Sequence, residues 1–170
     1  MALDADLIPR KGPDSYTHGV PQRAYGVDGD WSTDEAERFL REQRIPVRIA
    51  CRTPPGGLWM LSLWYRYSDG RLACATGANA RVVDYLREDP GVAFEVSTND
   101  PPYRGVRGAG SATVAPDEDT ETLRTMLERY LGGTDSELAE ILLAPGREEV
   151  RIEVGRAYTW DFSDRMPSTD

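Results

Sequence analysis

The sequence lacks the residues on which most side-chain catalysis depends. It contains one histidine, His18, one lysine, Lys11, and two cysteines, Cys51 and Cys74. A Ser-His-Asp or Cys-His arrangement would have to use His18, and a histidine among Gly, Pro and Tyr residues is more simply a solvated loop side chain. No cysteines and histidines have the spacing of a structural zinc site.

Motifs for metal-assisted hydrolysis and for phosphate binding are also missing. There is no HExxH sequence and no Walker loop. Gly105, Gly108 and Gly110 do not form a dinucleotide-binding fingerprint, because they lie inside one predicted strand rather than between a strand and a helix. We therefore assign no catalytic residue. If the protein is an enzyme, we expect a cofactor to carry the chemistry, with the chain supplying binding and orientation.

The sequence has no long apolar run and no excess of positive charge. No stretch of about 18 apolar residues could span a membrane, and residues 1–12 lack the apolar core of a signal peptide. The formal net charge of -9 repels nucleic acid phosphates and anionic lipids. We expect a soluble cytoplasmic protein without nucleic acid or membrane partners. The two cysteines, which stand in apolar strand-like runs, are expected to be buried thiols.

Arginine accounts for all but one of the 20 basic residues, beside 29 acidic ones. This balance resembles the proteins of salt-adapted organisms, and a genome rich in G and C would also favour arginine. A halophilic source is therefore one hypothesis, and stability in KCl is its test.

What the sequence does contain is a succession of short apolar strands with frequent turns. The length of 170 residues suggests one domain, and the apolar share of 39% suffices for a packed core. We interpret residues 1–30 as an N-terminal extension, 31–165 as the folded domain and 166–170 as a C-terminal tail.

The first helix is predicted over residues 32–44, because Ser32 and Glu35 have the spacing of a capping box. The segment 58–67 is apolar enough to be a long strand covered on both faces. Asn79 is placed to cap a short second helix. Long strands with interior glycines predict a small closed or nearly closed barrel with peripheral helices. The other predicted strands are 46–52, 71–76, 91–97, 103–115, 148–155 and 157–162, and the other predicted helices are 80–88, 117–131 and one starting near residue 136.

Two segments have both an ordinary and a functional interpretation. In residues 75–81, Thr76, Asn79 and Arg81 could form a phosphate site at a helix N-terminus. Alternatively, Thr76 only ends a strand and Arg81 pairs with Asp84, which is the favoured interpretation of this stretch alone. In residues 59–64, Ser62 interrupts an apolar strand that is otherwise typical of a core, and its hydroxyl could meet a heteroatom of a bound ring.

The order of these parts resembles the pyridoxamine 5'-phosphate oxidase-like family of FMN-binding split barrels. The resemblance rests on the apolar strand LWMLSLWY, a DG hairpin, a strand ending in Thr and a basic residue five positions later. It continues through LREDP, GVAFEV, PPYRGVRGAGSATV and YTWDF, and covers roughly residues 32–165. It implies a mainly β protein, a six-stranded antiparallel Greek-key split barrel of the FMN-binding type, which forms a homodimer with FMN at its interface and acts on a small-molecule substrate.

The resemblance also implies which residues bind the cofactor. The flavin ring would lie along residues 59–64, the ribityl phosphate would lie near the strand end at residues 75–76, and Arg81 would grip the phosphate. Trp160 resembles a tryptophan that reaches the flavin from the second subunit. The candidate cofactor-binding residues are therefore Trp59, Met60, Leu61, Ser62, Trp64, Ala75, Thr76, Asn79, Arg81 and Trp160.

The chain also departs from the authentic oxidases of this family. Val82 follows Arg81 where a second basic residue often stands, Trp64 replaces the lysine that ends the flavin strand, and no Arg-rich C-terminal motif is present. These departures argue against pyridoxamine-phosphate oxidase activity itself. Three hypotheses stay open: an FMN-dependent oxidoreductase, a deazaflavin-dependent reductase with Arg104 and Arg107 near an anionic tail, and a non-catalytic dimer.

Overall fold

The computed structural model of the protein describes residues 25–166. Most of the predicted N-terminal extension, residues 1–24 with His18 and Lys11, lies outside the described residues, as do residues 167–170. No helix in the described part of the chain is long and apolar enough to cross a membrane.

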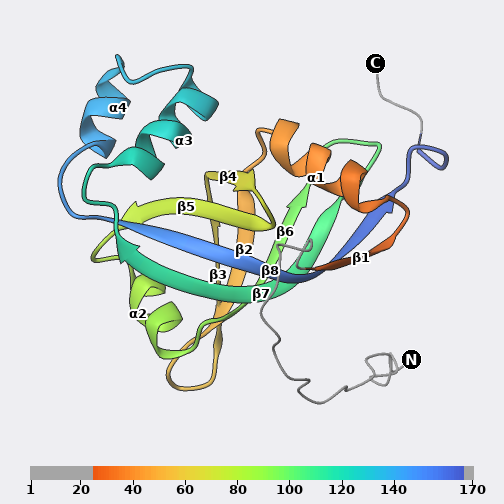
Figure 1. The fold of residues 1–170 in the computed structure, drawn as a ribbon, viewed down its shortest axis with the longest axis horizontal. Helices are drawn as coiled ribbons and strands as arrows, with labels where there is room; N and C mark the ends of the chain where they lie inside the picture. The colour runs from red at the N-terminus through yellow and green to blue at the C-terminus, as the bar shows by residue number, and fades with distance from the viewer. Residues whose placement is uncertain (1–24, 167–170) are drawn as a thin grey trace, which may run out of the picture.

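The described residues form one curved sheet with helices on its two sides (Figure 1). The hydrogen-bonded order is β3-β2-β6-β7-β8-β5-β4, with every neighbouring pair antiparallel, and β1 adds to β8 in parallel. The strands are β1 (Gly26–Gly29), β2 (Val47–Arg52), β3 (Leu58–Leu63), β4 (Tyr65–Ser68), β5 (Arg71–Gly77), β6 (Gly91–Ser97), β7 (Arg104–Pro116) and β8 (Arg147–Asp161).

The two ends of this sheet are joined through a single residue. β3 is at one end of the order and β4 at the other, yet only Trp64 separates them in the chain. The sheet must therefore curl until its ends meet. The mainly β fold with a curled antiparallel sheet is confirmed, although the predicted strand 58–67 is interrupted at Trp64. With β3 and β4 counted as that one strand, the sheet has seven strands, one more than the six that the resemblance implied, because β1 is added beside β8.

The final strand is longer than predicted. The sequence predicted two strands over 148–162, but β8 is one strand of 15 residues that pairs with β7 along most of its length. The prediction was wrong because Gly155 does not end the strand: the register shifts there, with Arg156 opposite Ala109 and Val154 opposite Gly110. Glycine is required where the strands approach, since a Cβ on Gly110 would lie 2.1 Å from the Glu153 carbonyl oxygen.

The helices are α1 (Thr33–Glu42), α2 (Arg81–Glu88), α3 (Glu121–Leu131) and α4 (Glu137–Leu142). The predicted capping box of α1 is confirmed: the Ser32 hydroxyl accepts from the Glu35 N–H, and the Glu35 carboxylate accepts from the Ser32 N–H at 2.8 Å. α3 begins later than predicted, because both oxygens of Asp117 accept backbone N–H groups of its first turn. In Figure 1, α3 and α4 lie together at one end of the sheet and α2 lies on the opposite side.

The interior of the curled sheet is the hydrophobic core. Alternating residues of β2 and β8 point into it, and Tyr65 is its largest fully buried side chain. Arg129 of α3 ties the helices to this core, because its guanidinium donates to the carbonyl oxygens of Leu40, Arg41 and Gln43 at the end of α1. A smaller cluster of Leu123, Leu127 and Ala139 packs between α3, α4 and the outside of β5.

Candidate functional site

A cavity of about 390 Å³ lies where the two ends of the sheet meet, between the strands and the pair of helices α3 and α4. Three of the predicted cofactor-binding residues, Ser62, Trp64 and Ala75, line it together. Its remaining walls come from residues that the sequence analysis did not single out as functional: Pro46, Leu63, Leu123, Met126, Leu138, Leu142 and Arg147.

The position of Trp64 explains one wall of this cavity. Its indole stacks on the ring of Tyr130 in α3, with ring centroids 5.1 Å apart and an angle of 8° between the ring planes. The Tyr130 hydroxyl in turn lies 3.4 Å from the Ile45 carbonyl oxygen. An interaction of this kind is favourable beyond the area it buries. It holds Trp64 against α3 at the point where the strand is interrupted.

The end of β5 leads from the cavity to the N-terminus of α2. The Ala80 N–H donates to the Gly77 carbonyl at 2.9 Å, so residues 77–80 form a tight turn. The N-cap of α2 is Ala80, and no side chain caps the helix. The prediction that Asn79 caps it was therefore wrong: the cap position falls one residue later, on an alanine that has no side-chain acceptor. The first N–H groups of the helix receive no side-chain cap.

Arg81 stands in this first turn and is exposed. The pairing of Arg81 with Asp84, which the sequence left as an alternative, does not occur: among the described residues no ion pair or hydrogen bond joins the side chain of Arg81 to any group. Val82, at the position where a second basic residue often stands in the family that the sequence resembles, is 1% exposed and belongs to the core.

The other predicted residues of β3 point in different directions. Trp59 packs edge-on against Tyr85 of α2, with centroids 6.0 Å apart. Leu61 lies opposite Ile49 and packs on the core. Met60 is 69% exposed on the outer face. The expectation that this segment is covered on both faces was wrong for the described chain, because Leu58, Trp59 and Met60 of β3 are exposed.

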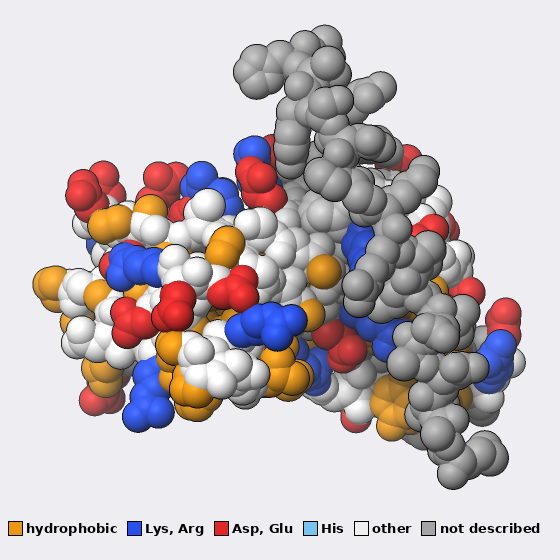
Figure 2. Space-filling view, turned by 90° about the horizontal axis from the view of Figure 1, so that it is seen from below, with side chains coloured by type: hydrophobic (Ala, Val, Ile, Leu, Met, Phe, Trp, Pro, Cys, Tyr) orange, Lys and Arg blue, Asp and Glu red, His pale blue; other side chains and the backbone are white. Residues whose placement is uncertain are grey.

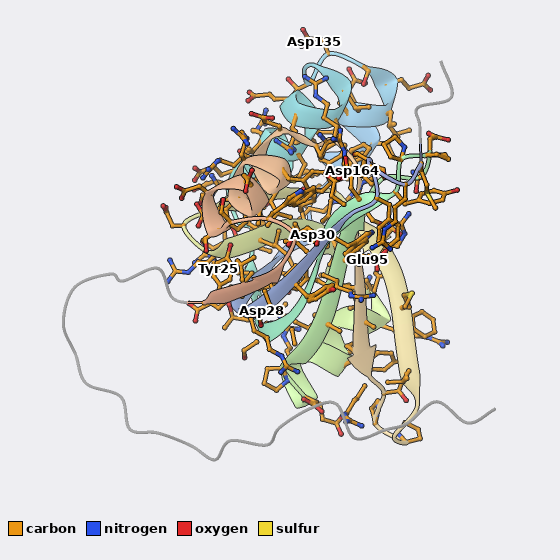
Figure 3. The ribbon with its side chains drawn as sticks, turned by 90° about the vertical axis from the view of Figure 1, so that its right-hand side faces the viewer. Tyr25, Asp28, Asp30, Glu95, Asp135 and Asp164 are labelled. Carbon is orange, nitrogen blue, oxygen red and sulfur yellow. The ribbon has the colours of Figure 1, made fainter. Side chains whose placement is uncertain are left out.

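A second, larger hollow of about 990 Å³ lies on the outer face of the sheet. Its floor consists of small residues from three adjacent strands, Ala50, Ala93 and Ala109, which lie side by side in the register. Met60 and Tyr158 are on its walls. Figure 3 shows Asp28 and Glu95, two of its acidic residues, on β1 and β6.

Trp160 lies on this outer face and does not line the cavity. The guanidinium of Arg107 lies 5.1 Å from the ring centroids of both Trp160 and Tyr158, at a distance typical of cation–π contacts. The outer hollow thus has an aromatic and cationic side. From below, Figure 2 shows acidic and basic side chains interspersed with exposed apolar ones.

Arg147 is the site residue that sequence reasoning missed. It is the first residue of β8, it is the register partner of Gly77, and its Nη1 atom lies 3.9 Å from where a Cβ on Gly77 would be. About 70 residues separate these two positions in the chain. Only the pairing of β5 with β8 brings them together, so no local pattern could have indicated the contact.

The polar side chains on the cavity wall are those of Ser62, Trp64 and Arg147. Neither cysteine is part of it: both thiols are buried in the core, and burial raises the pKa of Cys74 to about 12 and also raises that of Cys51. No cluster of metal-binding side chains occurs in the described part of the chain. A cavity with apolar walls and these three polar side chains can bind and orient a small molecule.

The known proteins that match this chain were found among solved structures. No model of a known protein family matches the sequence, and neither does any curated protein. A conserved hypothetical protein of Mycobacterium tuberculosis is 27% identical, with a TM-score of 0.66 over 78% of this chain and 86% of that chain. An F420 reductase is 20% identical, with a TM-score of 0.57 over 69% of this chain and 92% of that chain.

Two further solved structures are similar in the same way. An FAD-binding protein of Mesorhizobium loti is 21% identical, with a TM-score of 0.56 over 75% of this chain and 92% of that chain. A candidate pyridoxamine 5'-phosphate oxidase of Listeria innocua is 11% identical, with a TM-score of 0.56 over 74% of this chain and 95% of that chain. The chain therefore has the split-barrel fold of the pyridoxamine 5'-phosphate oxidase-like proteins.

Proposed function

We propose that the protein is an oxidoreductase that binds FMN in the split of the barrel and works as a homodimer on a small-molecule substrate. This proposal rests on the continuous chain segment that leads from the cavity to Arg81. β5, whose Ala75 lines the cavity, continues through the tight turn at 77–80 into an uncapped helix N-terminus with an arginine that has no partner in the described residues.

The residues at this strand end fit a phosphate group. Uncapped N–H groups and the dipole of α2 favour an anion, and an arginine can donate two parallel hydrogen bonds to phosphate oxygens. Thr76 adds a hydroxyl next to this turn, and the small side chains of residues 77–80 allow close approach to the backbone. In the proposal, Arg81 and the first turn of α2 hold the FMN phosphate.

The ring would lie along β3, between Ser62, Trp64 and Ala75. A bound flavin supplies hydride or electron transfer, for which no protein acid or base is obligatory. The chain's own part is to hold the ring, to exclude water with the apolar walls of the cavity, and to present Ser62 as a hydrogen-bonding group.

The outer sheet face supports the homodimer. Its hollow has a floor of small residues and exposed apolar residues, and Met60 and Leu58 lie uncovered on the end strand. A surface that combines apolar residues with charged ones such as Arg48, Glu95 and Arg107 occurs in protein–protein interfaces. In the proposed dimer the second copy covers this face, and Trp160 of that copy approaches the flavin.

A deazaflavin coenzyme is the second candidate. The similarity to an F420 reductase supports it, and so does the presence of Arg104 and Arg107 on β7, because a longer anionic tail needs additional cations. Arg104 has a buried Nε atom without an acceptor among the described residues.

Absorption spectroscopy tests the proposal. The purified protein is incubated with FMN, with riboflavin or with the deazaflavin coenzyme, and free ligand is removed by gel filtration. We expect FMN to be retained, with the two visible bands of an oxidised flavin, and riboflavin to be retained less well because it lacks the phosphate. Retention of the deazaflavin alone would favour the second candidate, and a protein that retains none of the three is not a flavoprotein.

A further inference from the structure

The cavity between the strands and α3–α4 has one feature that binding of FMN along β3 leaves unused. Its inner wall, at Ser62, Trp64 and Ala75, is the wall assigned to the cofactor. Its outer wall is made by Leu123 and Met126 of α3 and Leu138 and Leu142 of α4, and Arg147 lies at the end of β8 beside them. The outer wall and Arg147 are not assigned to the cofactor.

Arg147 is a cation without a carboxylate partner among the described residues. The only hydrogen bond of its guanidinium to a described residue runs from Nη2 to the Ile141 carbonyl oxygen at 3.4 Å, and its Nε is buried without an acceptor. The two carboxylates that follow it in the chain are already engaged: Glu148 pairs with Arg87 at 2.9 Å, and Glu149 pairs with Arg151. A guanidinium that is partly removed from water gains most from an anion that can accept two of its N–H groups.

The rest of the cavity suits an apolar molecule. Leucine and methionine side chains and the indole of Trp64 form most of its surface, and its volume of about 390 Å³ is within the usual range of sites for small organic molecules. Leu138 is 47% exposed and marks the side open to solvent. A ligand can therefore enter between α4 and the strands.

We propose that this cavity binds a small organic anion, with its carboxylate, or a sulfonate or phosphate of similar shape, on Arg147 and its apolar, ring-sized body against Leu123, Met126 and Leu142. The existence of this site does not depend on a cofactor. Its designation as the substrate site rests on the proposed function, because a molecule held there would lie beside a flavin placed along β3. The substrate class is then an apolar carboxylic acid or a similar anion.

A matched pair of fluorescent probes tests the site in the full-length protein without added cofactor. Anilinonaphthalene sulfonate carries one anionic group on an aromatic body, and phenylnaphthylamine has the same body without the charge. We expect the wild-type protein to bind the anionic probe more tightly. Arg147→Gln should weaken that probe roughly tenfold or more, which is the effect of losing a charge-assisted hydrogen bond, and should leave the neutral probe unchanged. Arg147→Lys should retain part of the preference.

Arg156→Gln is the control, because Arg156 is on the same strand but lines the outer hollow. An effect of Arg156→Gln without an effect of Arg147→Gln would place the probe on the outer face and overturn the proposal. Equal loss of both probes in Arg147→Gln would also overturn it, since the residue would then only maintain the cavity.

A third arm uses the protein saturated with FMN. Binding of the anionic probe that persists beside FMN supports a separate substrate site. Displacement of the probe by FMN would show that the cavity belongs to the cofactor, against the proposal. Binding of the probe through Arg147 in a protein that retains no flavin would support the anion site and contradict the proposed FMN function, so the two failures are distinguishable.

Discussion

Arg81 combines exposure, an uncapped helix N-terminus and the absence of any partner in the described residues. Replacing it with alanine should weaken FMN binding by about 1–3 kcal/mol, because a charge-assisted contact to the phosphate is lost. Riboflavin, which has no phosphate, should bind equally well to both proteins. Titrations followed by quenching of flavin fluorescence would measure both affinities.

Arg71→Ala is the matched control for this change. Arg71 stands at the opposite end of β5 and pairs with Glu153 at 3.1 Å, away from the cavity. If Arg71→Ala weakened FMN binding as much as Arg81→Ala, the loss would reflect the net charge of the protein rather than a contact with the phosphate. If Arg81→Ala bound FMN with unchanged affinity, Arg81 would not be part of the phosphate site.

The buried thiol of Cys74 makes the stability of the folded protein depend on pH. Burial raises its pKa from the ordinary 9.0 to about 12, so the unfolded chain releases a proton in this range while the folded chain keeps it. Stability is therefore complete below pH 9.0 and falls as the pH rises toward 12. Cys74→Ala should unfold at lower denaturant concentration but show a shallower decline across this range. Chemical denaturation at several pH values would measure it, and parallel pH profiles of the two proteins would contradict the assignment.

Residues that are close together in the sequence determine where α1 begins. Its capping box satisfies N–H groups at the helix start, and a cap of this kind contributes about 0.5–2 kcal/mol. Ser32→Ala should lower the free energy of unfolding by about this amount, as measured by urea denaturation. Ser32→Asp, which retains an acceptor, should lose much less. Equal losses in the two variants would mean that the hydroxyl is not acting as a cap.

Elements with local signals were predictable from the sequence, and elements decided by distant contacts were not. The Ser32 cap follows from a short-range pattern, the spacing of Ser32 and Glu35. The interruption at Trp64 depends on its stacking with Tyr130, and the continuity of β8 depends on how Gly155 is accommodated opposite β7. Both are tertiary effects that override local preference.

The same distinction applies to the candidate site. Ser62, Trp64 and Ala75 could be proposed together because a resemblance places them along one ligand, and they line one cavity. Arg147 could not, because its position depends on the register between β5 and β8. Met60 and Trp160 lie on the outer face of the same chain. Neither residue lines the cavity, so their role stays a prediction.

For the whole molecule, the outer sheet face should be the dimer interface. Ala93 lies in the floor of the outer hollow, where a glutamate would place bulk and a buried charge between two copies. Ala93→Glu should therefore shift the protein to monomers in sedimentation velocity experiments. Leu131→Glu, at an exposed position at the end of α3, is the control and should remain dimeric. A wild-type monomer, or a dimer that tolerates Ala93→Glu, would contradict this interface.

The charge of the whole chain leads to a separate prediction about salt. A net charge of -9 produces repulsion that dissolved ions screen. If the source is salt-adapted, the free energy of unfolding should rise steadily with KCl, as measured by denaturation at several KCl concentrations. A stability that does not increase with salt would reject the halophilic hypothesis.

The long strand β8 has a consequence for the order in which the molecule can be assembled. It pairs with β1, β5 and β7, yet it is the last of the described strands to leave the ribosome. During synthesis, β5 and β7 therefore each keep an unpaired edge until β8 has been made. The nascent chain can form the β2–β3 and β6–β7 pairs early, but the sheet is completed only after β8 has been synthesised. Chains that stop before residue 147 should consequently aggregate rather than fold into a smaller barrel.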